Sequence, residues 1–207
     1  MSEVETVLFD IGKTKEILTA SVGSLSRLYP APKTGDIVFY KEVPNADPKL
    51  PSIKVPLAKA QLPAQKPGPF LILINRNPPG AELEFSTLVI DHSLEKFPAN
   101  TYRVYNYSKR RLAVRLANVN AVLNSGQSES IPYPNARKAW LKVAADEKEE
   151  GWLLVSSSPQ PVGANTRTTV FLVDLKPSVL DPDPKGIMDR QMRERIYTDD
   201  AGVQHVR

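Results

Sequence analysis

The sequence predicts an all-β protein, a two-sheet antiparallel sandwich of immunoglobulin-like type that ends in a short helical tail. Short apolar runs alternate with turn residues along most of the chain, which is the pattern of antiparallel strands. Nineteen of the 207 residues are proline and only ten are glycine, and so much proline disfavours long helices. About nine to eleven such runs can be counted, which is enough strands for two packed sheets.

The N-terminal half contains five predicted strands, which are separated by long and stiff connections. They lie at residues 7–9, 16–22, 36–40, 70–74 and 85–91. The run at 70–74 is apolar throughout, which favours a central strand buried on both faces. Eleven of the prolines fall within residues 30–79. Because proline cannot donate to a strand ladder, we expect these stretches at sheet edges or in loops.

Alternation is clearer in the second half, beginning at residue 102. Tyr102 and Val104 share one face of a predicted strand. Arg103, Tyr105 and Tyr107 share the other, because successive side chains of a strand point to opposite faces. One face of this strand is therefore predicted to be apolar and the other to carry arginine and tyrosine.

The next predicted strand covers residues 111–116, and its leucine and valine residues share a face in the same way. Residues 108–110 are expected to join it to the preceding strand as a hairpin turn. A second hairpin is predicted at 123–128, where Gly126 can supply the positive φ of a tight turn. Further strands are predicted at residues 139–144, 151–155 and 168–174, the first two joined by an acidic solvated loop.

Residues 1–175 are predicted to form one sandwich domain, and residues 176–207 a polar C-terminal tail. Met188, Met192 and Ile196 recur in the tail at i, i+4 and i+8, which predicts a short helix over about 184–197 with one narrow apolar stripe. The stripe would dock either on the body of the protein or on a partner.

The basic charge of the chain is concentrated in one window. The net charge is +4, yet residues 96–128 contain six bases and no acid, so the rest of the chain carries −2. Tyrosine rings offer stacking surfaces and arginine forks bind carboxylate, sulfate or phosphate. The predicted contact residues are Arg103, Tyr105, Tyr107, Lys109, Arg110, Arg111 and Arg115. A single basic segment disfavours nucleic acid as the ligand, because such binders usually combine several basic elements.

Catalytic and cofactor signatures are sparse. The chain has no cysteine and only two histidines, His92 and His205, so neither a nucleophilic triad nor a metal-ligand cluster is predicted. Asp181 and Asp183 do not form a calcium loop. Glycine-rich phosphate loops are missing from the sequence. We therefore predict no catalytic residue, no metal site and no cofactor. No apolar run approaches the ~20 residues of a membrane span.

Two short motifs resemble a known group of proteins. Residues 97–106 read FPANTYRVYN and resemble the LPAGxYRVxN strand entry of uncharacterised exported β-sandwich proteins of bacteria, with Asn100 in place of the glycine. Residues 123–128 read LNSGQS and are similar to the LxPGxS hairpin of that group, with Ser125 in place of the proline. The resemblance covers residues 97–174. It implies a sandwich and export to the periplasm or cell surface, and it brings no catalytic residues.

These observations predict a non-catalytic binding or assembly module of a bacterial envelope, which contacts a protein partner or an acidic glycan through the basic residues above. The alternative is a carbohydrate-binding accessory domain that uses the tyrosines with Trp140 or Trp152, although both tryptophans lie in apolar strands and are expected in the core. An enzyme of unknown class ranks third. The first residues lack the basic start and apolar core of a signal peptide. The protein is therefore expected to be periplasmic or at the cell surface if a leader was removed, and otherwise cytoplasmic.

Overall fold

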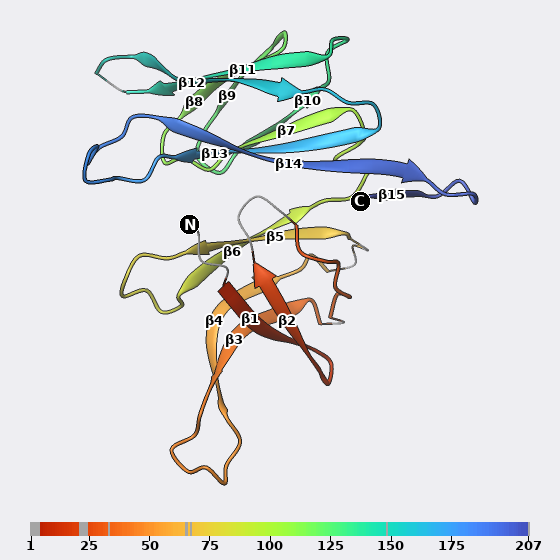
Figure 1. Cartoon of the computed structure of the whole chain (residues 1–207), viewed down its shortest axis with the longest axis vertical. Helices are drawn as coiled ribbons and strands as arrows, with labels where there is room; N and C mark the ends of the chain where they lie inside the picture. The colour runs from red at the N-terminus through yellow and green to blue at the C-terminus, as the bar shows by residue number, and fades with distance from the viewer. Residues whose placement is uncertain are drawn as a thin grey trace. The chain divides into compact units, whose positions relative to one another are not determined.

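The computed structural model describes residues 5–20, 25–32, 34–64, 66, 68–147 and 149–206, apart from the side chains of residues 5, 6 and 20. Within these ranges the chain forms fifteen β-strands, labelled in Figure 1, and no helix. The all-β prediction is thereby confirmed. The chain divides into two compact units, Met1–Lys96 and Phe97–Arg207, here called the N-terminal and C-terminal units. The sequence had suggested a division at residue 175 instead.

The N-terminal unit contains a four-stranded antiparallel sheet and a two-stranded ribbon. The sheet has the order β2-β1-β3-β4, with β1 (Glu5–Ile11), β2 (Thr14–Ala20), β3 (Asp36–Val43) and β4 (Ile53–Gln61). The ribbon consists of β5 (Phe70–Arg76) and β6 (Phe85–Asp91). Among the described strands β5 pairs with β6 alone, so the apolar run expected as a central strand has one hydrogen-bonded neighbour rather than two.

The C-terminal unit is built from two sheets. The first has the order β10-β7-β13-β14-β15, and the second the order β12-β11-β8-β9. Their bounds are β7 (Thr101–Asn106), β8 (Leu112–Leu116), β9 (Val119–Leu123), β10 (Ser128–Pro132), β11 (Lys138–Asp146), β12 (Trp152–Pro161), β13 (Thr166–Asp174), β14 (Ile187–Thr198) and β15 (Gln204–Val206). All described pairings are antiparallel except that of β13 with β7, which is parallel.

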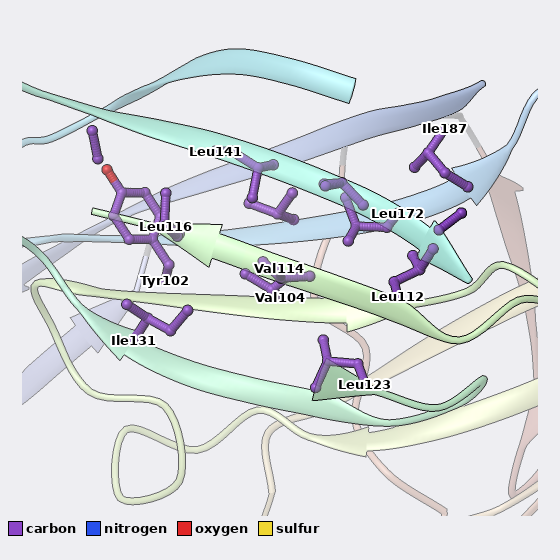
Figure 2. Close-up of a cluster of buried hydrophobic side chains, with 14 residues drawn as sticks. Tyr102, Val104, Leu112, Val114, Leu116, Leu123, Ile131, Leu141, Leu172 and Ile187 are labelled. Atoms are coloured by element: carbon purple, nitrogen blue, oxygen red, sulfur yellow. The ribbon is translucent and has the colours of Figure 1, made fainter. Parts of the chain in front are cut away.

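The core of the C-terminal unit lies between these two sheets. Figure 2 shows Tyr102 and Val104 of β7, Leu112 and Val114 of β8 and Leu141 of β11 within one cluster of buried side chains. Each of these side chains is almost completely buried. The two predicted apolar faces, on 102–104 and 112–116, are therefore both confirmed. Burial of one face from each sheet gives the sandwich its main stabilising contribution.

The chain order within the sandwich differs from the predicted hairpins. Strands β7 and β8 follow one another in sequence but belong to different sheets, so residues 107–111 cross between the sheets instead of forming a hairpin turn. Residues 124–127 likewise pass from β9 in one sheet to β10 in the other. Gly126 does adopt the predicted positive φ, at +80°. The buried side chain of Asn106 fixes both crossings, donating to the carbonyl oxygens of Arg110 (2.7 Å) and Leu123 (2.9 Å).

The prediction of a C-terminal helix is wrong. Residues 187–198 form β14, the longest described strand, which pairs with β13 over nine residues. Met188, Met192 and Ile196 are separated by four residues, and an even spacing places side chains on one face of a strand as well as on one face of a helix. The long ladder with β13 decides between the two structures, since it pairs nine residues of this segment with a neighbouring strand.

Candidate functional site

The predicted contact residues are distributed over three environments in the C-terminal unit. Arg103 and Tyr105 of β7 are both 7% exposed. The guanidinium of Arg103 lies 4.5 Å from the centre of the Phe97 ring, and Tyr105 stacks on Phe171 with ring centres 5.5 Å apart. Tyr107, which is half-buried, packs edge-on against the same phenylalanine. These three side chains pack against the protein itself, which accounts for their arrangement on the strand.

Arg110 of the connection 107–111 is held by carboxylates that are distant in sequence. Its guanidinium contacts Glu147 at 2.6 Å and Asp174 at 3.0 Å. The hydroxyl of Ser108 donates to Asp174 at 2.7 Å, and so does the backbone N–H of Lys109 at 2.9 Å. Arg110 thus anchors the connection to the end of β13, and its charge is already compensated.

The electrostatics of Asp174 reflect this anchoring. Burial by itself would raise the pKa of the Asp174 carboxyl. The hydrogen bonds from Lys109 N–H, the Ser108 hydroxyl and the Arg110 guanidinium outweigh burial and lower the pKa below its usual value. The carboxylate is therefore ionised at neutral pH, and it stabilises the crossing between the sheets.

Arg111 and Arg115 belong to a different surface, the outer face of the sheet β12-β11-β8-β9. Arg115 is an exposed residue of β8, and Arg111 lies immediately before that strand. Arg111 is 3.7 Å from the carboxylate of Asp146 and 5.5 Å from the ring centre of Trp152. Lys109 is exposed at the connection 107–111. The structure therefore does not bring the seven predicted residues together into one surface.

Both tryptophans lie on this outer face. Trp140 of β11 is 57% exposed and Trp152 of β12 is 46% exposed, so the expectation that they belong to the core is wrong. Ala139 and Leu141 take the buried positions of β11, which turns Trp140 outward. Trp152 pairs with Asp146 across the strands and shares its outward face. Both indoles therefore add exposed apolar surface to this sheet.

The strand register arranges the outward side chains between the tryptophans in two rows. A polar row consists of Asn120, Arg115, Lys142 and Ser157, which are successive cross-strand partners on β9, β8, β11 and β12. An apolar row beside it consists of Val122, Ala113, Ala144 and Leu154. Val122 is 49% and Leu154 61% exposed, while the two alanines are half-buried between them. We call the two rows and the two tryptophans the tryptophan face.

The two rows enclose a shallow hollow of about 300 Å³. The small side chains of Ala113 and Ala144 lie at its centre, with Val122 and Leu154 on either side. Arg115 and Lys142 line it from the polar row. The hollow is open to solvent and joins an apolar surface to a pair of positive charges. This combination suits a ligand that carries an apolar face next to an anionic group.

Arg115 and Lys142 are direct cross-strand partners and carry the same charge. Like charges placed directly opposite one another destabilise a sheet. No carboxylate among the described residues forms an ion pair with either side chain. The positive charge of this pair therefore faces solvent without compensation, unlike that of Arg110 and Arg111.

Most of the tryptophan face was not predicted from the sequence, although one signal for it was present. Trp140 and Lys142 are two residues apart on β11 and must share a face. A lysine on the face of an apolar run indicates that this face is solvated. The acidic partners of Arg110 and Arg111, and the pairing of Arg115 with Lys142, leave no comparable mark because they join distant segments.

The described residues offer little else that resembles a functional centre. They contain no group of three or more histidine, aspartate or glutamate side chains placed to hold a metal ion. His205 contacts the Asp199 carboxylate at 2.7 Å in an exposed turn, and His92 is buried after β6. In the described parts of the chain no helix is long and apolar enough to cross a membrane. No protein-family model matches this chain, and no curated protein matches it in sequence.

Proposed function

We propose that the chain is a non-catalytic binding or assembly module that holds an acidic partner on the tryptophan face. The observation that carries this proposal is the cross-strand pair of Arg115 and Lys142, which lies next to exposed aromatic and aliphatic side chains. An anion that contacts both cations would remove their mutual repulsion and gain two charge-assisted hydrogen bonds. The exposed apolar row would add hydrophobic contact area.

The proposed contact surface revises the sequence-based one. Arg115 remains within it, and Trp140, Trp152 and Lys142 are added. Arg111 contacts Trp152 at the edge of this surface, but its charge is paired with Asp146. Arg110 is assigned to the stability of the fold, because Asp174 and Glu147 already neutralise it. Lys109 is exposed, so its substitution tests the contact surface predicted from the sequence independently of the tryptophan face.

We also propose that the C-terminal unit is immunoglobulin-like and that the protein acts in a bacterial envelope. The nine strands that the structure describes in two sheets between Phe97 and Arg207 agree in size with an immunoglobulin-type sandwich of about 100 residues. The resemblance of residues 97–174 to exported β-sandwich proteins supports the location. Fractionation of the source cells with an antibody against the protein tests it, and recovery in the cytosolic fraction alone would contradict it.

The binding proposal is tested with immobilised acidic polymers of two chemistries, poly-glutamate and polygalacturonate. We expect the native protein to bind at least one of them at low salt and to be released as salt screens the charges. The double variant R115A/K142A should lose this binding. The control K109A/K176A removes the same charge from exposed positions off the tryptophan face and should keep it. No binding to either polymer, or equal loss in both variants, would contradict the proposed function.

A further inference from the structure

We infer that the acidic ligand is an anionic polysaccharide, a chain of sugar rings that carries carboxylate or sulfate groups and lies on the tryptophan face. This inference rests on the proposed function and names the chemistry of its partner. In it, Trp140 packs against the apolar face of one ring while Arg115 and Lys142 hold an acidic substituent. Trp152 provides a second packing site further along the chain.

The position of the tryptophan face within the sheet argues against a peptide ligand. Strands β8 and β11 pair with neighbours on both sides, β8 with β9 and β11, and β11 with β8 and β12. Their backbone donors and acceptors are therefore used within the sheet. A peptide that binds by strand addition needs a free edge, and among the described strands of this sheet only β9 and β12 provide one. A ligand at Arg115 and Lys142, on the central strands, is therefore bound by side chains.

The side chains present there match a sugar ring. A pyranose ring has an apolar face formed by its C–H groups and a polar edge formed by its substituents. The exposed indole of Trp140 offers a flat apolar surface, and its N–H provides one donor. The polar row beside it, which includes Asn120 and Ser157, offers hydrogen-bonding groups for hydroxyls.

The positive charge of the tryptophan face favours an anionic sugar over a neutral one. The outward positions of β8 and β11 include Lys138, Lys142 and Arg115 as bases, against Asp146 as the acid. Asp146 lies near Arg111. Arg115 provides a planar fork that fits a carboxylate or sulfate, and Lys142 adds a second positive charge at the neighbouring position. A neutral polysaccharide would leave this pair uncompensated.

The distance between the two tryptophans favours a chain of sugars over a single sugar as the ligand. Trp152 pairs with Asp146, which lies six residues beyond Trp140 on β11. At about 3.3 Å per residue, the two indoles are separated by about 20 Å along the strand direction. The basic pair and the apolar row lie between them. A long chain reaches both tryptophans, whereas a disaccharide reaches only one.

The experiment measures binding of the full chain by calorimetry to four probes: digalacturonate, long polygalacturonate, neutral dextran and poly-glutamate. We expect long polygalacturonate to bind, and W140A to lower the affinity for it by about tenfold or more. W152A should lower the affinity for the long polymer by a similar factor and leave the affinity for digalacturonate unchanged. Y197A, which removes an exposed aromatic side chain of β14, is the matched control and should have no effect.

Three results would overturn the inference. Dextran binding as tightly as polygalacturonate would remove the charge requirement. Poly-glutamate binding with a loss in R115A/K142A but none in W140A would support an acidic protein partner, so that the proposed function stands while the glycan inference fails. Binding by neither acidic polymer would refute both. Circular dichroism of each variant is the control for the fold, which these exposed substitutions should leave intact.

Discussion

Replacing Lys142 by glutamate should make the C-terminal unit more stable and at the same time abolish binding of acidic ligands. Lys142 lies directly opposite Arg115 in the sheet, so K142E changes a repulsive cross-strand pair into an attractive one. Few single substitutions are expected to raise stability, since most changes in a native protein lower it. A gain in stability in K142E would therefore be specific evidence for repulsion between Lys142 and Arg115.

The magnitude follows from Coulomb's law. Directly opposite side chains have Cβ atoms about 5 Å apart, and two unit charges at that distance in water interact by about 0.8 kcal/mol. Exchanging repulsion for attraction doubles this to about 1.6 kcal/mol at most, and side-chain mobility reduces it, so we expect about 1 kcal/mol. The gain should shrink at high salt, because both side chains are exposed.

The assay is urea unfolding followed by tryptophan fluorescence. Both tryptophans of the chain, Trp140 and Trp152, belong to the C-terminal unit, so the signal follows that unit alone. The control is K138E, which makes the same charge change on the same strand opposite Pro161 instead of a base. The reasoning is refuted if K142E is no more stable than the native chain, or if K138E gains as much.

Three other predictions test the fold. D174N should lower the free energy of unfolding by about 1–2 kcal/mol at pH 7, because it weakens the hydrogen bonds to Lys109, Ser108 and Arg110. The folded-state pKa of Asp174 is lowered, so the stability that this carboxylate contributes is present above its unfolded-state pKa and is lost as the pH falls through its folded-state pKa. In urea unfolding, the stability of D174N should therefore depend less on pH below about 4 than that of the native chain. L141A removes a fully buried core side chain and should cost about 2–5 kcal/mol in the same assay; a loss below about 1 kcal/mol would contradict the described core. The fragment Phe97–Arg207 has its own core and should unfold cooperatively on its own, which differential scanning calorimetry would show as a single transition.

Local alternation predicted the inward side chains of β7 and β8, but it predicted neither the outward position of the two tryptophans nor how the strands pair. Tyr102 and Val104 were correctly placed on a buried face, because strand periodicity is a property of neighbouring residues. The connection 107–111 was expected to be a hairpin, yet it crosses between sheets. A run of four or five polar residues can form either a hairpin turn or a crossing between sheets. The hydrogen bonds of Asn106 that fix the crossing join it to Arg110 and Leu123, and the local pattern does not show them.

In the candidate site, too, local features were predictable from the sequence and long-range contacts were not. The basic window was visible in the sequence, but the acids that neutralise part of it were not. Asp174 lies 64 residues from Arg110, and Glu147 lies 37 residues from it. Likewise Met188, Met192 and Ile196 fit a helix and a strand equally, and only pairing with β13 decides the outcome. Long-range pairing accounts for what sequence reasoning missed in both cases.

A physical criterion therefore separates the charges that the fold pairs internally from those that we propose to bind a ligand. Arg110 and Arg111 have carboxylates within ion-pair distance, so their charges are used by the fold. Arg115 and Lys142 lie opposite one another and raise the energy of the sheet, and no described carboxylate offsets this cost. This pair near Trp140 supports our proposal that an anion outside the chain contacts both cations, at a cost to the sheet of about 1 kcal/mol.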